Sequence, residues 1–256
     1  MADRPAIPLW MWPNVLSLDA PIIAVIWQDF LNRCYPATLQ PPGRIVLGLT
    51  VWAIYLADRL LDVRRPPHAA AHDNDSVRHD FYRRHRTAMR TVLIAVLCAD
   101  ALVAAVWLRP VVLSSGLLVG VGVALYLAMF PLRNWAGTSW KKPAAALLFT
   151  AGVFLITWVS TAEPTAQLAG PAAVFCGLCL ANLLLIQKWD RSRQQGWILL
   201  LALFGLRALT RGLPWFSAVT VSAAGLGTLA LGWRWISPNA RGVLADIALL
   251  TPLLFR

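Results

Sequence analysis

The feature that most limits how this chain can fold is a series of long apolar runs, each ended by proline, glycine or charged residues. Nine runs are predicted, at about 15–33, 43–62, 88–108, 111–130, 143–160, 169–189, 196–210, 215–233 and 241–255. A helix of about 20 apolar residues is long enough to cross the hydrocarbon core of a bilayer. We therefore predict an all-α, polytopic membrane bundle of about nine transmembrane helices, tilted or irregular where a run is short.

Composition excludes the soluble alternative. The chain of 256 residues is 58% hydrophobic and only 14% charged, whereas about a quarter of the residues of a soluble domain are charged. So much apolar surface does not fit inside one soluble core, and a lipid bilayer is the expected surrounding. We predict a single integral membrane domain over 1–256, with one long hydrophilic loop at about 64–87.

The positive charge follows the predicted topology. The net charge is +11, and most Lys and Arg residues lie in the loops after the second, fourth, sixth and eighth runs. Positively charged loops resist translocation and stay in the cytoplasm. We therefore place the N-terminus in the cytoplasm and attribute the charge to topology, with no nucleic-acid partner.

The hydrophilic loop has two interpretations. It holds all four histidines of the chain and a basic run from His79 to Arg86. The histidine spacing matches no known metal-ligand pattern. A solvated, partly helical loop is the simpler interpretation, and a lid over a nearby site that takes an anionic ligand is the functional one.

Two carboxylates close the second run. Asp58 and Asp62 are four residues apart, so both lie on one helix face, one turn apart. Like charges in this arrangement repel, and they are costly to desolvate at a membrane boundary. A Mg²⁺ ion with oxygen ligands would offset that cost. Ion pairs with Arg59, Arg64 or Arg65 would offset it as well, and both interpretations stay open.

The sixth run ends with a second polar pattern. Asn182 and Asp190 are separated by a multiple of four residues, so they stay near one helix face. The topology brings Asp58, Asp62 and Asp190 to the same membrane face. Cations expected at that face are Arg64, Arg65, Lys141, Lys142, Lys188 and Arg191. Carboxylates, Mg²⁺ and cations together form a clamp for a diphosphate, and the apolar bundle would hold a hydrophobic tail.

These patterns resemble the UbiA-type intramembrane prenyltransferase superfamily over nearly the whole chain, most closely a divergent bacterial branch. That family has nine transmembrane helices, a central cavity and aspartate-rich motifs at the cytoplasmic ends of helices 2 and 6. The first motif, NDxxDxxxD, corresponds here to Ile54, Tyr55, Asp58 and Asp62, so its leading Asn-Asp pair is lost. The second, DxxxDxxxD, corresponds to Asn182, Ile186 and Asp190, so one acid remains.

The resemblance implies a site and a chemistry. Asp58 and Asp62 would hold one Mg²⁺, and Asp190, helped by Asn182, a second; these three aspartates would be the catalytic residues. The basic residues named above would bind the diphosphate of a prenyl diphosphate. Aromatic faces stabilise cations, and the cavity candidates are Trp27, Trp52, Tyr55, Tyr126 and Phe149. The expected location is the bacterial inner membrane, with the site facing the cytoplasm.

Three functions stay open at this point. The first is transfer of the prenyl group to an apolar, aromatic or quinoid acceptor. The second is a terpene cyclase on the same scaffold, in which the substrate's own double bond captures the cation. The third is a non-catalytic lipid-binding or transport protein, which would explain the lost acids but not the retained Asp58 and Asp62 pair. Asp29, Asp100, Arg207 and Asp246 are further charges in or beside apolar runs, and Asp246 with Arg207 is one conceivable pair.

Overall fold

The computed structural model describes residues 7–35, 41–63, 76–129, 140–161, 165–185, 191–209 and 214–255. Within them every regular element is helical, which confirms the all-α prediction. The elements are η1 (Leu9–Met11), α1 (Trp12–Val15), α2 (Asp19–Cys34), α3 (Pro41–Asp62), α4 (Ser76–Arg84), α5 (Arg86–Trp107), α6 (Pro110–Met129), α7 (Lys141–Ser160), α8 (Thr165–Leu185), α9 (Arg191–Leu209), α10 (Pro214–Leu231), η5 (Gly232–Trp235), α11 (Pro238–Ala248) and η6 (Thr251–Phe255).

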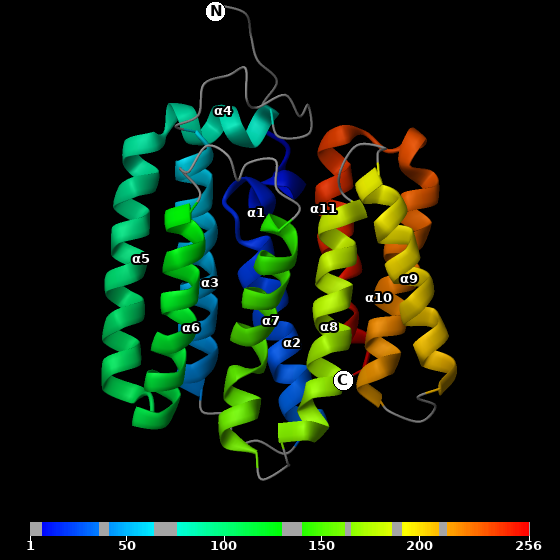
Figure 1. The fold of residues 1–256 in the computed structure, drawn as a ribbon. Coiled ribbons are helices and arrows are strands. Elements are labelled where there is room, and N and C mark those ends of the chain that lie inside the picture. Colours follow the sequence, from blue (N-terminus) through cyan, green and yellow to red (C-terminus); the bar gives the residue numbers. More distant parts are fainter. Residues whose placement is uncertain are drawn as a thin grey trace, which may run out of the picture.

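The long helices stand side by side and alternate in direction, and the short helix α4 lies across one end of them (Figure 1). We call this end the α4 end. Helices α3, α6, α8 and α10 finish there, and α2, α5, α7, α9 and α11 begin there (Figure 1). The alternation agrees with the predicted succession of spans, since each of the nine predicted ranges contains a helix.

Apolar length singles out a smaller set of these helices as candidate spans. Four are long and apolar enough to cross a membrane: Arg86–Trp107, Pro110–Met129, Lys141–Ser160 and Gln167–Leu185. The bent pair Leu9–Val15 and Asp19–Cys34 would make a fifth. Helix α3 is not in this set; it has 22 residues but carries Arg44 near its start and Asp58, Arg59 and Asp62 at its end. The bundle therefore has several apolar helices of membrane-spanning length, as an integral membrane protein requires.

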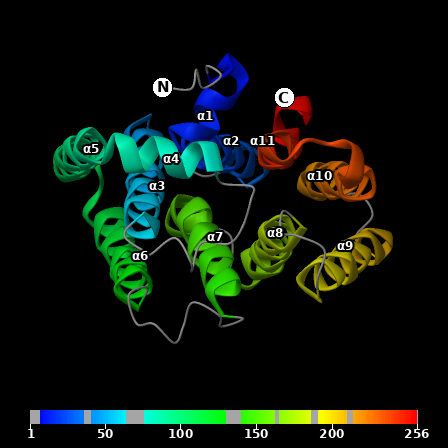
Figure 2. The same cartoon turned by 90° about the horizontal axis from the view of Figure 1, so that it is seen from above.

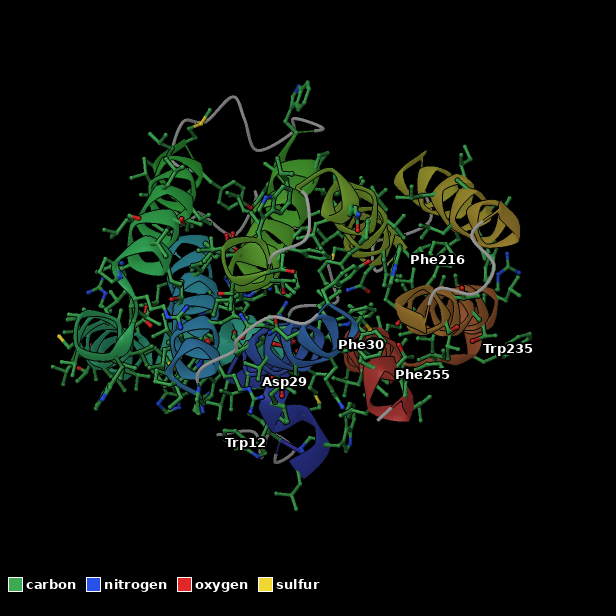
Figure 3. The ribbon with its side chains drawn as sticks, turned by 90° about the horizontal axis from the view of Figure 1, so that it is seen from below. Trp12, Asp29, Phe30, Phe216, Trp235 and Phe255 are labelled. Carbon is green, nitrogen blue, oxygen red and sulfur yellow. The ribbon has the colours of Figure 1, made fainter. Side chains whose placement is uncertain are left out.

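The core surrounds α2. Seen from above, α3 and α7 flank α2, with α5 and α6 to one side and α8, α9 and α10 to the other (Figure 2). Trp27 of α2 is 1% exposed and packs against Phe175 of α8, with ring centroids 4.7 Å apart. At the end opposite α4, Phe30 meets Phe255 of η6, with centroids 6.4 Å apart (Figure 3). Helix α2 is thus the element on which both halves of the chain pack.

The outer helices α5 and α6 are mostly exposed. In their apolar windows only 6% of each is buried inside the structure. Ile94, Leu97 and Leu102 of α5 and Leu117 and Leu118 of α6 are among the exposed large apolar side chains. Exposed apolar surface of this extent needs lipid or a partner to cover it, which supports the membrane assignment.

The chain turns sharply before α2. The bend between Leu9–Val15 and Asp19–Cys34 is 81°. Ser17 has a φ of 56°, the left-handed conformation. Its N–H donates to the Asn14 carbonyl and the Leu18 N–H donates to the Pro13 carbonyl, the paired bonds of a Schellman helix end, in which glycine is usual. The Ser17 hydroxyl is 3.1 Å from the Tyr82 hydroxyl of α4, so α4 helps to hold the turn.

Helix α4 changes the interpretation of the hydrophilic loop. The described part of the predicted 64–87 loop is largely helical, in agreement with the partly helical interpretation, and α5 already begins at Arg86. Tyr82 is only 1% exposed and belongs to a cluster with Ala53, Leu56 and Leu60 of α3. The basic run from His79 to Arg86 did not indicate this packing, because its two aromatic residues are the only apolar residues within it. Residues 64–75 lie outside the described ranges, and the lid hypothesis stays a prediction.

Candidate functional site

The last two turns of α3 bring charged groups to the α4 end of the bundle. Arg59 Nη1 is 3.5 Å from Asp62 Oδ2, and the two side chains are partly buried. Asp58 is also partly buried, and its Oδ1 atom has no hydrogen-bond donor. The predicted ion pair with Arg59 therefore forms at Asp62, whereas the buried Oδ1 atom of Asp58 accepts no hydrogen bond from the described residues and has only a longer contact with a cation.

The start of α7 supplies the cation nearest to Asp58. Lys141 Nζ lies 3.8 Å from Asp58 Oδ1. The two residues are 83 positions apart, and only the packing of α7 near the end of α3 joins them. Lys142 follows in the first turn of α7, is half-buried and has polar contacts of its own. The structure thus brings together one predicted metal ligand and one predicted diphosphate-binding residue.

Two tyrosines lie beside these charges. Tyr126 of α6 is within electrostatic range of Asp58, Asp62 and Arg59. Tyr55, one turn before Asp58 on α3, is within range of Asp58 and Arg59 too. Both were predicted as cavity residues, and both are near enough to these charges to interact with them electrostatically.

A second acidic cluster, which the sequence interpretation did not find, joins the N-terminal segment to α11. Asn14 Nδ2 donates to Asp19 Oδ2 at 2.8 Å and to Asp246 Oδ2 at 3.4 Å. Asp19 and Asp246 are within hydrogen-bonding reach of each other, and Arg78 of α4 is near them. The only sequence signal was that Asp246 is a costly charge in an apolar run. Its partners here are Asn14 and Asp19, and the side chain of Arg207 lies outside the described residues.

The contact between Ser17 and Tyr82 borders this cluster. Tyr82 lies outside the candidate spans, on α4. Burial raises the pKa of its phenol above the ordinary value, while the hydrogen bond with Ser17 and the nearby Arg59 and Arg78 act in the opposite direction. The neutral phenol is therefore the form that the fold accommodates.

The second predicted motif is described only in part. Asn182 of α8 is 7% exposed, and its Oδ1 atom has no hydrogen-bond partner among the described residues. Asp190 lies outside the described residues, as do Arg64, Arg65 and Lys188. Arg191 opens α9, but its side chain is not described. Helix α8 nevertheless ends at the α4 end, as predicted (Figure 1).

Trp27, Trp52 and Phe149, the other predicted cavity residues, make packing contacts. Trp27 Nε1 donates to the Leu249 carbonyl at 2.8 Å, and Trp52 Nε1 donates to the Leu16 carbonyl at 3.0 Å. Phe149 stacks on Phe175 with centroids 6.3 Å apart. The two indoles bind backbone carbonyls near helix ends, which positions α2 against the C-terminal segment and α3 against the turn before α2.

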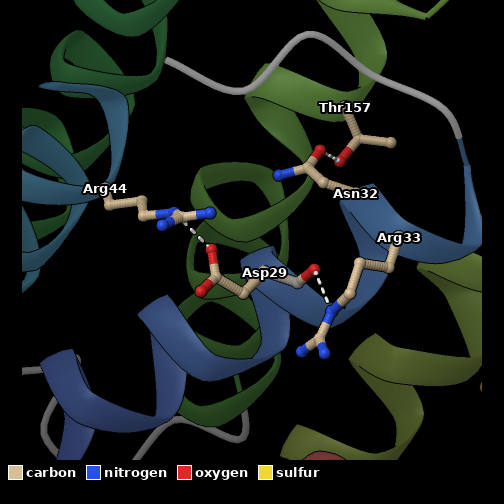
Figure 4. A network of polar contacts seen from close by, with 5 residues as sticks. All are labelled: Asp29, Asn32, Arg33, Arg44 and Thr157. Carbon is tan, nitrogen blue, oxygen red and sulfur yellow. Dashed lines mark hydrogen bonds and ion pairs between the residues drawn. The ribbon is translucent and has the colours of Figure 1, made fainter. Parts of the chain in front are cut away.

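The opposite end of the bundle carries a different polar network (Figure 4). Arg44 Nε is 2.6 Å from Asp29 Oδ1, and Arg33 Nε donates to the Asp29 carbonyl at 3.2 Å. Thr157 of α7 donates to Asn32 Oδ1 at 2.8 Å. These contacts join α2 to α3 and α7 far from Asp58, and they are structural ties.

The side chains described at the α4 end supply some of the ligands that a divalent cation needs. Among the described residues, no group of three or more His, Cys, Asp and Glu side chains could hold a metal ion. Asp58 and Asp62 supply carboxylate oxygens of the kind that Mg²⁺ prefers, and that ion often completes its shell with water and substrate phosphates. The orphaned Asp58 oxygen fits this role, so two carboxylates are the described part of the site.

Comparison of the chain with protein-family models, with curated proteins and with solved structures found no match.

Proposed function

We propose that this protein is an integral membrane enzyme of the UbiA type, with nine membrane-spanning segments around a central cavity. It ionises a prenyl diphosphate in a Mg²⁺-dependent reaction and transfers the prenyl group to an apolar, aromatic or quinoid acceptor. Its membrane is the bacterial inner membrane, with the N-terminus and the site in the cytoplasm. The observation that carries this proposal is the contact between Asp58 and Lys141 at 3.8 Å.

That contact supports a diphosphate site for an electrostatic reason. A carboxylate with a buried, unbonded oxygen holds a divalent cation, and an ammonium beside it attracts the remaining charge of a bridging diphosphate. Neither the carboxylate nor the ammonium alone distinguishes a diphosphate site from an ordinary ion pair. Together, at the end of an apolar bundle, they suit a ligand with a polyanionic head and an apolar tail.

In this proposal each residue of the site has its own role in the ionisation of the prenyl diphosphate. Mg²⁺, held by Asp58, Asp62 and, in this proposal, Asp190 and Asn182, would neutralise charge that develops on the diphosphate as the C–O bond breaks. Lys141 and Lys142 bind the leaving diphosphate, which departs with the bonding electron pair. Tyr55 and Tyr126 offer aromatic faces to the allylic cation. Apolar helices exclude water until a nucleophile attacks the cation.

The test is diphosphate release by protein purified in detergent. We would incubate it with Mg²⁺ and prenyl diphosphates of C10, C15, C20 and longer chains, with and without aromatic or quinoid acceptors. Asp58→Asn removes the charge at constant size and is expected to abolish release. Asp100→Asn is the matched control, because Asp100 lies on α5 and hydrogen-bonds Thr50 instead.

Each outcome has a distinct meaning. Release that requires an acceptor and is lost in Asp58→Asn supports the transferase. Release without acceptor, with a cyclic product that is lost in the same variant, replaces the transferase by a cyclase. No release from folded protein under any condition rejects both enzymes in favour of lipid binding or transport.

A further inference from the structure

A cluster of arginines lies where α4 meets α5, outside the site proposed above. Arg84 ends α4, and Arg86 and Arg90 lie in the first turns of α5. We call these three residues the arginine corner. Arg84 and Arg90 are exposed. Among the described residues none forms an ion pair with any of the three, and the Nε atom of Arg86 is buried without an acceptor.

The chain carries no acidic residue from the end of α4 through most of α5. Residues 81–99 contain no Asp or Glu. Arg83, the next arginine, is already bound to Asp80, with Nη2 2.7 Å from Oδ1. Like charges repel, so an anion bound at the corner would lower the electrostatic energy of these arginines.

An apolar stripe leads away from the corner. Arg90, Ile94 and Leu97 are spaced as i, i+4 and i+7 and share one face of α5. Ile94 is 62% and Leu97 49% exposed. Helix α5 has 22 residues, about 33 Å of helix, which matches the thickness of the hydrocarbon core. Its exposed far end carries Trp107 and Arg109, residue types that are enriched at the membrane boundary.

The N-terminal segment extends the surface beside α4. Trp12 packs edge-on against Phe81 of α4, with ring centroids 5.9 Å apart. Next to it, Leu9 is 86% exposed and Trp10 49% exposed. Helix α4 lies across the bundle (Figures 1 and 2), so basic and apolar side chains occur together at one level. This is the pattern of an interfacial membrane contact.

From these features we propose that the arginine corner binds the headgroup of an anionic phospholipid, whose acyl chains lie along the exposed apolar stripe of α5. Anionic lipids attract basic segments at the cytoplasmic leaflet, and guanidinium groups match phosphate in geometry. The proposal does not depend on diphosphate chemistry at Asp58, because none of these arginines belongs to that site.

The experiment is native mass spectrometry of the delipidated protein in detergent. The protein is titrated with phosphatidylglycerol and with phosphatidylcholine of the same acyl chains. We expect tighter binding of phosphatidylglycerol. Arg84→Gln, Arg86→Gln and Arg90→Gln should each weaken that binding about fivefold. Arg109→Gln, the same substitution at the other end of α5, should leave it unchanged.

Three results would overturn the proposal. The first is equal binding of the two lipids. The second is an Arg109→Gln variant that loses as much affinity as the corner variants. The third is displacement of phosphatidylglycerol by inorganic phosphate at equal concentration, which would make the corner a site for small anions rather than for lipid. Thermal unfolding of each variant without lipid checks that it is folded.

Discussion

Lys141 Nζ lies 3.8 Å from Asp58 Oδ1, which ties the start of α7 to the end of α3. The two side chains are 37% and 20% exposed. At this distance a partly exposed ion pair makes only a modest contribution to the free energy of unfolding, about 1 kcal/mol. Whether the pair mainly stabilises the fold or mainly binds a ligand can be measured.

Replacing Lys141 by Gln should weaken substrate binding more than it weakens the fold. The variant loses one charge-assisted contact with the diphosphate, so we expect the KM for prenyl diphosphate to rise about tenfold. The melting temperature should fall only modestly, because the contact is long and partly exposed. Steady-state kinetics and thermal unfolding in detergent measure the two effects. Lys141→Arg, which keeps the charge, should recover most of the affinity, and an unchanged KM in Lys141→Gln would remove Lys141 from the site.

The contact between Lys141 and Asp58 also shows which features of the structure could be predicted from the sequence and which could not. Apolar runs and their breakers predict a helix in each of the nine runs, because local hydrophobicity and proline determine where such a helix can begin and end. The spacing of Asp58 and Asp62 likewise places both on one face of α3. Contacts between distant segments carry no such local signal. Asn14 and Asp246 are separated by 232 positions, and only the packing of α11 against the N-terminal segment brings them together.

Helix α4 illustrates a second reason why the structure differs from the sequence prediction. A short polar segment has no apolar periodicity from which a packed helix could be predicted. Two aromatic residues determine where α4 packs. Phe81 contacts Trp12, and Tyr82 packs in one cluster with apolar residues of α3. Tertiary packing therefore overrides a composition that is typical of a solvated loop.

The cluster of Asn14, Asp19 and Asp246 should depend on its amide donor. Asn14→Ala would leave two neighbouring carboxyl groups without that donor, and we expect a loss of about 2 kcal/mol in the free energy of unfolding. Asp246→Asn should cost less, because it removes the repulsion between the carboxylates and keeps a hydrogen-bonding side chain. Denaturant unfolding of the two variants in detergent gives the comparison. If Asp246→Asn were the more damaging change, the Asp246 charge would be held by Arg78 and this account would be wrong.

Gln28 should be replaceable by an apolar residue. Its side chain is fully buried in α2, and neither its Nε2 nor its Oε1 atom has a hydrogen-bond partner among the residues that the structure describes. Unpaired buried amides are costly, so Gln28→Met, of similar volume, should raise the free energy of unfolding by about 1 kcal/mol. Asn32→Leu, one turn along the same helix, should lower it, since Asn32 accepts the Thr157 hydrogen bond. A destabilised Gln28→Met would mean that the amide has a partner, such as a bound water or ligand.

Tyr82 should make the fold sensitive to alkaline pH. Because burial raises the pKa of the folded phenol, the folded state holds this proton more tightly than the unfolded chain, whose tyrosines titrate near pH 10. The associated stability is fully present below about pH 10 and is lost as the pH rises through the pKa of folded Tyr82. Tyr82→Phe should lose about 1 kcal/mol at neutral pH, from the Ser17 contact, and should lose less than the wild type between neutral and alkaline pH. Thermal unfolding from pH 8 to 11 tests this, and parallel curves for the two proteins would assign the alkaline loss to other groups.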